Sequence, residues 1–207
     1  MAQRTYPRPD AHHAVTAGNV LARHEGAVGR AVELPVPIDL IIEQTYGLTL
    51  LWDEIIEPPN TMILGALFPQ EKQIVMNTRH EEFFGRVIGP ERFTLAHELG
   101  HWIYDADSPD QLTLDLSAGP AEQFCYHRQG PALPDDLRVR EMNANKFASH
   151  LLMPEGLVRA ADIDEVLDNF RETAASWGVS QQALGYRLRS LKLIDDVDAE
   201  RLQLDLG

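Results

Sequence analysis

The sequence has almost no cysteine: of its 207 residues, only Cys125 is one. A single cysteine cannot form a disulfide within the chain, and no CxxC pair suggests a zinc ribbon or a thioredoxin-like redox site. The chain also lacks the apolar core of a signal peptide and any apolar run long enough to cross a membrane. From these absences we expect a cytoplasmic protein that does not insert into a membrane.

Positive charge is scarce as well. The chain has 18 Lys and Arg residues against 32 Asp and Glu residues, which gives a net charge of -14. Such acidity disfavours broad affinity for nucleic acid or anionic lipid. What the chain does contain is typical of a folded globular protein, with 44% hydrophobic and 24% charged residues. Its length fits one domain, or one domain with a small appendage.

The composition along the chain indicates three regions. Residues 1–34 show no sustained hydrophobic period and predict a flexible N-terminal arm, whose histidines we assign to the surface. Residues 35–155 predict the folded core, interrupted at residues 105–136 by an insert rich in Pro, Gly and Asp. Residues 156–207 predict a C-terminal helical subdomain that ends in an acidic tail. The oligomeric state cannot be predicted from these patterns.

Within the core and the C-terminal region, hydrophobic spacing and breaker residues predict the elements of an α+β fold. The three strand-like segments are short and follow one another closely, which predicts a small antiparallel sheet. In chain order, the expected elements are a helix after Pro37, strands at residues 48–56, 62–68 and 73–77, a helix from Pro90, a helix from Asp135 or Asp136 to Met153, and helices at residues 162–177 and 180–191.

The helix that begins at Pro90 carries the sequence HELGH, an HExxH motif, at residues 97–101. Residues four apart lie on one face of a helix, so the imidazoles of His97 and His101 can reach one metal ion. Two neutral imidazoles and one carboxylate suit Zn²⁺ and leave a fourth position for water. Glu98 lies beside that position, where it can act as the general base that activates the water.

The next long helix supplies a candidate third ligand. Glu141 and Asn145 are four residues apart and can face the first helix together. We predict that Glu141 completes the zinc site and that Asn145 hydrogen-bonds a ligand histidine from behind. His150 lies nine positions beyond Glu141, roughly half a turn around the helix, and therefore points away from the metal. A donor for the oxyanion of the reaction is also needed. Tyr104, Tyr126 and His127 are candidates, and the sequence does not choose among them.

These two motifs resemble those of the ImmA/IrrE family of metallopeptidases. The stretches RFTLAHELGH (residues 92–101) and EMNANKFASHLLMP (residues 141–154) are similar to the family's two signatures, and the likeness extends over about residues 36–194. The resemblance implies a zincin-like, gluzincin-type fold, zinc bound by His97, His101 and Glu141, and catalysis by Glu98. It also implies a protein substrate, namely a helix-turn-helix repressor of a prophage, mobile element or stress response.

In two respects the sequence departs from the family pattern. The insert at residues 105–136 lengthens the gap between the two motifs, and it could shape or cover the cleft. The chain is also too short for the sensory domain of the radiation-response members, so it resembles the compact ImmA-like members more. We expect an extended substrate segment to add as a strand at residues 62–68 or 73–77.

A rival interpretation concerns residues 173–191, whose spacing also fits a helix-turn-helix that reads DNA. In that case Gln181, Gln182, Arg187 and Arg189 would face a groove. The alternative function is then a DNA-binding or partner-binding regulator, of the toxin or antitoxin type, with a sensory or vestigial zinc site. The overall acidity favours the other possibility, that these helices brace the catalytic core and do not bind DNA.

Overall fold

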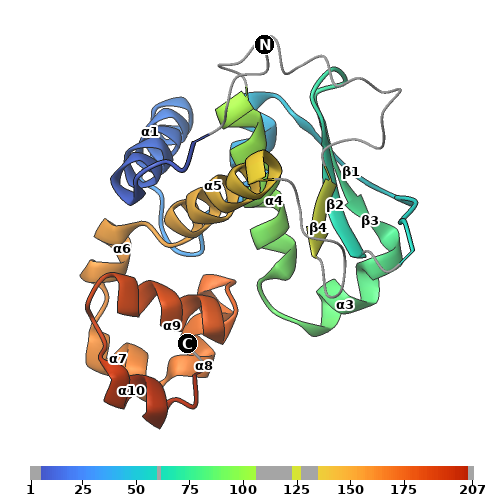
Figure 1. Cartoon of the computed structure of the whole chain (residues 1–207). Coiled ribbons are helices and arrows are strands. Elements are labelled where there is room, and N and C mark those ends of the chain that lie inside the picture. Colours follow the sequence, from blue (N-terminus) through green and yellow to red (C-terminus); the bar gives the residue numbers. More distant parts are fainter. Residues whose placement is uncertain (1–5, 60–61, 106–122, 127–134, 205–207) are drawn as a thin grey trace.

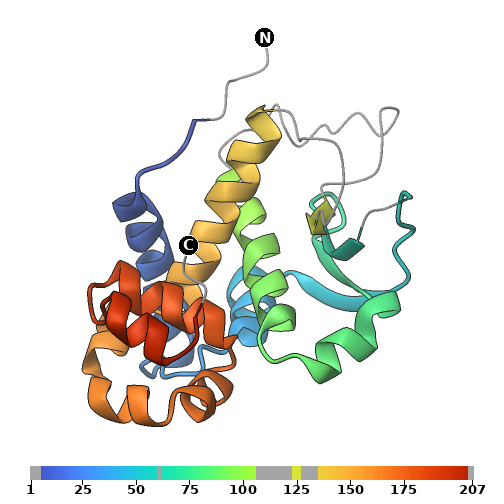
Figure 2. The ribbon, with the colours of Figure 1, turned by 60° about the horizontal axis from the view of Figure 1, so that its bottom comes forward.

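The computed structural model describes residues 6–59, 62–105, 123–126 and 135–204. The predicted α+β fold is confirmed: a small sheet lies on one side, and helices make up the rest of the chain (Figure 1). From the sheet outward, α4 (Pro90–Asp105), α5 (Asp135–Leu152) and α1 (Asp10–Val28) follow one another, as Figure 2 also shows. The two helices that carry the motifs therefore lie at the centre of the molecule.

The sheet contains β1 (Thr49–Asp53), β2 (Met62–Phe68), β3 (Gln73–Asn77) and β4 (Gln123–Tyr126) in the order β1-β3-β2-β4. It is mixed, whereas the sequence predicted an antiparallel sheet. β2 pairs antiparallel with both β3 and β4, but β1 pairs parallel with β3. The reason is that β2 and β3 form a tight hairpin, which leaves β1 only the outer edge of β3.

This strand order corrects the expected position of a substrate strand. β3 is flanked by β1 and β2, and β2 is flanked by β3 and β4. An added strand would have to displace one of these neighbours, so the prediction for residues 62–68 or 73–77 was wrong. Among the described strands, the edges are β1 and β4. β4 lies inside the predicted insert, and the rest of residues 106–134 lies outside the described residues.

Both faces of the central strands are covered, which explains their nearly continuous apolar sequences. On one face, Leu64 and Leu67 of β2 join the main core with α4. On the other face, Ile63 and Ala66 join a smaller cluster. A Cβ atom at Gly65 would come within 2.7 Å of the Thr94 methyl group. Glycine at this position therefore lets the first half of α4 lie close against β2.

The N-terminal region differs from the predicted flexible arm. Residues 10–28 form α1, which packs along α5 and buries Ala17, Val20 and Leu21. His13 and His24 fall on the same stripe and are buried. A hydrogen bond links His13 Nδ1 and the Tyr104 hydroxyl (2.6 Å), and another links His24 Nδ1 and Thr45 Oγ1 (2.7 Å). The helical period was missed because two of its core positions are polar residues that gain partners only in the fold.

Short elements connect these layers. The helix predicted after Pro37 consists of α2 (Ile38–Leu40) continued by a π-helical turn, η1 (Ile41–Thr45). After β3, a 3-10 turn η2 (Thr78–His80) leads into α3 (Glu81–Arg86), and α4 then begins at Pro90 as predicted. The search for membrane-spanning helices among the described residues finds none with the required length and apolarity.

The C-terminal region is helical, as predicted, and its helices gather at one end of the molecule beyond α5 (Figures 1 and 2). The helix expected at residues 162–177 is two helices, because Asn169 leaves the helical conformation between them. Gly178 then ends α8 in a left-handed conformation (φ 66°), and the Ser180 side chain caps α9. The elements are α6 (Glu155–Ala160), α7 (Ile163–Asp168), α8 (Phe170–Trp177), α9 (Gln181–Ser190) and α10 (Asp196–Arg201).

Candidate metal centre

Two histidines of α4 and one glutamate of α5 converge on a single point. The Nε2 atoms of His97 and His101 are 2.9 Å apart. Glu141 places Oε2 at 3.2 Å from His97 Nε2 and Oε1 at 3.3 Å from His101 Nε2. One potential ligand atom from each residue lies within 4.8 Å of the others, as a common ion requires. The structure thus brings together the three residues that the two motifs nominate.

Close contact between α4 and α5 makes this convergence possible. Gly100 sits where the helices touch: a Cβ atom there would come within 2.9 Å of Phe147 Cδ1 and 3.3 Å of the Ala144 Cα atom. Small residues on both helices, Gly100 and Ala144, let the two backbones approach closely. The glycine of HELGH therefore holds the histidines near Glu141. This role was missed in the sequence, although a glycine inside a strongly apolar helix signals close packing.

Asn145 lies directly behind the first histidine. His97 Nδ1 and Asn145 Oδ1 are 2.9 Å apart, and because Oδ1 can only accept, the ring nitrogen donates. Donation from Nδ1 leaves the lone pair of the neutral ring on Nε2, the atom that faces His101 and Glu141. Asn145 therefore fixes both the orientation and the tautomer that metal binding needs.

The electrostatics of the cluster also suit a cation. Complete burial lowers the pKa of His97 to about 4, only partly opposed by its hydrogen bond with Glu141, so this ring is neutral at pH 7. Burial acts to raise the pKa of Glu141, but hydrogen bonds and charge interactions with His101 and His97 outweigh it and hold that pKa well below its ordinary value. At neutral pH the site thus presents a neutral imidazole beside a carboxylate.

This donor set fits zinc. Zn²⁺ commonly takes imidazole nitrogen and carboxylate oxygen, and catalytic zinc sites use three protein ligands with a fourth position open to water. Within the described ranges, the cluster contains three donor residues: His97, His101 and Glu141. The residues present therefore fit a catalytic zinc ion better than a closed structural one.

A family model matches more than half of the chain, including both motifs. The profile of a family described as the IrrE N-terminal-like domain, Peptidase_M78, matches residues 59–189, which is 131 of the 207 residues and includes every residue of the cluster. The chain belongs to this family. The resemblance to ImmA/IrrE metallopeptidases is thereby confirmed, and the family name indicates metallopeptidase-type chemistry.

Among solved structures, a Mycobacterium tuberculosis transcriptional regulator aligns with a TM-score of 0.48 and 16% sequence identity. The alignment covers 86% of this chain but 46% of that chain, so this chain spans less than half the length of the regulator. Curated proteins yield no significant match to the sequence.

The other residues that the sequence analysis considered for this IrrE-like site lie in different parts of the structure. Glu98 is fully buried on α4, one residue after His97 and one helical turn before His101. The hydroxyl of Tyr104 forms a hydrogen bond with His13 of α1 and is therefore engaged outside the metal centre. His150 is also turned to α1, where its Nε2 lies 3.1 Å from Asp10 Oδ1. The side chain of Tyr126 and all of His127 lie outside the described residues.

Replacement of Asn145 by Ala should weaken zinc binding or activity by roughly 10- to 100-fold without unfolding the chain. The reason is that His97 loses the acceptor that fixes its tautomer and ring orientation, while the three ligands stay in place. Zinc affinity is measured by competition with a chelator of known affinity, and circular dichroism checks the fold. An unchanged zinc dissociation constant together with unchanged turnover would remove Asn145 from the site.

Proposed function

We propose that the chain is a zinc-dependent endopeptidase that cuts one or a few sites in a folded partner protein, a helix-turn-helix repressor. One observation carries the proposal: the two histidines of the HExxH helix and Glu141 converge beside a fully buried Glu98. A purely structural zinc site needs no acid-base residue at this position. A hydrolytic site needs one.

The residues take up the following roles. His97, His101 and Glu141 hold the ion, and Asn145 keeps His97 in the binding tautomer. Zinc, when bound, acts as a Lewis acid that activates water and polarises the scissile carbonyl. Glu98 accepts the proton of the attacking water and returns it to the leaving nitrogen, so the amide bond is replaced by a new acid and a new amine.

Substrate binding is proposed along β4. Of the strands that flank α4, β2 is paired on both sides, whereas β4 pairs only with β2 among the described strands. An extended substrate segment that added to β4 would gain main-chain hydrogen bonds, and pockets nearby would then select its side chains. The substrate segment would thus still bind by adding as a strand, but at β4 and not at residues 62–68 or 73–77.

The test of this function is incubation of the zinc-loaded chain with a cognate helix-turn-helix repressor and, separately, with casein. We expect one or a few cuts in the repressor and little digestion of casein, because a strand-adding site selects its substrate. Rapid casein digestion would contradict the specificity. A wild-type chain inert towards both proteins would favour a non-catalytic or partner-dependent role.

The contacts that α9 makes within the protein argue against the DNA-binding alternative. Arg187, one of the side chains expected to face DNA, is buried, and its Nε donates to the Met153 carbonyl at 2.9 Å. Arg189 forms an ion pair of 2.9 Å with Asp196. Two of the four side chains that would read or hold DNA are thus engaged within the protein, which supports the bracing role of these helices.

Accordingly, sequence-specific DNA binding should be absent, or weak and lost at moderate salt, because few positive charges remain to contact phosphates. Fluorescence anisotropy with a labelled operator duplex from the same genetic region measures this, at two salt concentrations and against a scrambled duplex. Nanomolar binding to one operator at physiological salt would restore the regulator alternative.

A further inference from the structure

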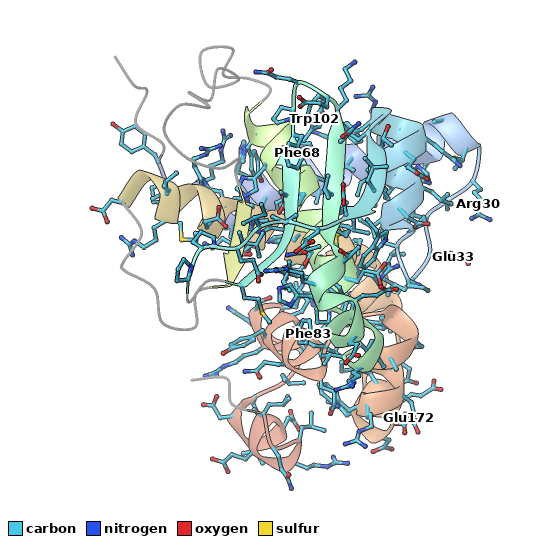
Figure 3. The ribbon with its side chains drawn as sticks, turned by 90° about the vertical axis from the view of Figure 1, so that its right-hand side faces the viewer. Arg30, Glu33, Phe68, Phe83, Trp102 and Glu172 are labelled. Atoms are coloured by element: carbon cyan, nitrogen blue, oxygen red, sulfur yellow. The ribbon has the colours of Figure 1, made fainter. Side chains whose placement is uncertain are left out.

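A large apolar cavity lies next to the metal centre, where the catalytic core meets the C-terminal helices. Its volume is about 860 Å³. Side chains of β2, α3, the first turn of α4, the end of α5 and α9 line it. Figure 3 shows one of them, Phe83, where α3 faces the C-terminal helices. The chemistry proposed for the metal centre does not require this space.

The cavity and the metal centre lie on consecutive turns of the same helix, α4. Phe93 and Thr94 belong to its wall, and Phe93 lies one helical turn before His97, with ring centroids 6.4 Å apart. One helical turn rises about 5.4 Å, whereas each residue of an extended chain spans about 3.3 Å. An extended polypeptide with its scissile bond at the metal would therefore reach this wall within about three residues of the bond.

The wall has the chemistry of a site for apolar side chains. Among the described residues that line it, none is charged and most are aliphatic or aromatic. One polar group stands out: Thr94 is completely buried, and its hydroxyl has no hydrogen-bond partner in the part of the chain that the structure describes. Because this hydroxyl is covered by its neighbours, it adds no exposed polar group to the wall.

Tight backbone contacts hold α9 in place as one wall of the cavity. Gly89, with a φ of 104°, lies so close to the α8–α9 turn that a Cβ atom there would be 2.5 Å from the Ser180 amide nitrogen. This contact holds α9 with Gln182, Ala183 and Tyr186 directed to the cavity. The helix that resembles a DNA-reading helix thus presents part of its surface to the space beside the metal.

We propose that this cavity binds apolar side chains of the substrate polypeptide within about three residues of the cut bond, and that α9 thereby determines sequence preference. The inference rests on the proposed peptidase function and adds to it a substrate class: segments with large aliphatic or aromatic residues next to the cleavage site. The volume exceeds what one side chain fills, so the cavity can accept a large aliphatic or aromatic residue, or more than one apolar side chain of the substrate.

The test uses fluorescein-labelled decapeptides that differ only at two central residues, Leu-Leu, Phe-Phe, Ser-Ser or Asp-Asp. Anisotropy measures their binding to the zinc-loaded Glu98→Gln variant, which should not consume them. We expect Leu-Leu and Phe-Phe peptides to bind at least about tenfold more tightly than the Ser-Ser peptide, as burial of a large apolar side chain predicts. In addition, Ala183→Trp, which takes up part of the cavity, should reduce this preference.

Gln181→Trp is the matched control, since it adds the same ring to the exposed neighbouring position that does not line the cavity. Tyr186→Asp is a second cavity variant, at a residue that is 48% exposed, and it should also reduce the preference. Equal binding of all peptides, or a preference that survives both cavity variants, would overturn the proposal. Preferential binding without cleavage of the same peptides by zinc-loaded wild type would instead contradict the peptidase function alone.

Discussion

Replacement of Glu141 by Ala is expected to remove stoichiometric zinc from the purified protein, as is replacement of His97 or His101. Wild type should bind about one zinc ion per chain, held by three protein ligands. Loss of one ligand should weaken binding by more than the roughly 10- to 100-fold expected for a supporting residue such as Asn145. Elemental analysis after dialysis, with a chelator competition for affinity, measures the effect.

His150→Ala is the control for this series. It removes a buried imidazole from the same helix as Glu141, but one that faces Asp10 of α1 and not the metal centre. Its zinc content should therefore equal that of wild type. If Glu141→Ala retained one zinc ion per chain, Glu141 would not be the third ligand, and the site would have to be completed by a residue outside this cluster.

The second large effect concerns the general base. Glu98→Gln should bind zinc and substrate as wild type does, yet cleave the substrate roughly 10² to 10⁴ times more slowly. Glutamine has nearly the same shape as glutamate and preserves packing at this fully buried position, but it cannot accept the proton of the attacking water. Single-turnover rates with enzyme in excess isolate this step from substrate binding and product release.

Two controls make the result specific. Zinc content must be unchanged in Glu98→Gln, so that a slow reaction reflects the lost base and not a lost metal. Glu155→Gln offers the same chemical change at an exposed glutamate whose partner is Arg159, and it should leave the rate unaltered. A Glu98→Gln variant that is as fast as wild type would refute the assigned mechanism.

Much of the fold was predictable because its local signals agree with its packing. β2 and β3 begin and end where the apolar runs and breakers predicted, and α4 and α5 begin at Pro90 and Asp135. What the sequence could not indicate was set by long-range contacts. The parallel pairing of β1 with β3 depends on which strand edge is open. That residues 10–28 form a packed helix and not a flexible arm depends on the hydrogen bonds that link His13 with Tyr104 and His24 with Thr45.

The same distinction holds for the site. Helical spacing alone placed His97 with His101 and Glu141 with Asn145, because residues four apart share a face. The cavity beside the metal could not be predicted, since its lining comes from five separate elements and its shape depends on the contact between Gly89 and Ser180. The burial of Arg187 could not be predicted either. Its place in a helix-turn-helix pattern does not indicate that it bonds the Met153 carbonyl.

The most direct test of zinc-dependent peptidase function is intact-mass spectrometry of a helix-turn-helix repressor encoded next to this chain. The repressor is incubated with zinc-loaded wild type, with wild type after zinc removal, and with zinc-loaded Glu98→Gln. We predict two fragments whose masses sum to the repressor plus one water molecule, produced by zinc-loaded wild type alone. An intact repressor after incubation with zinc-loaded wild type, or the same fragments formed equally fast by Glu98→Gln, would contradict the account.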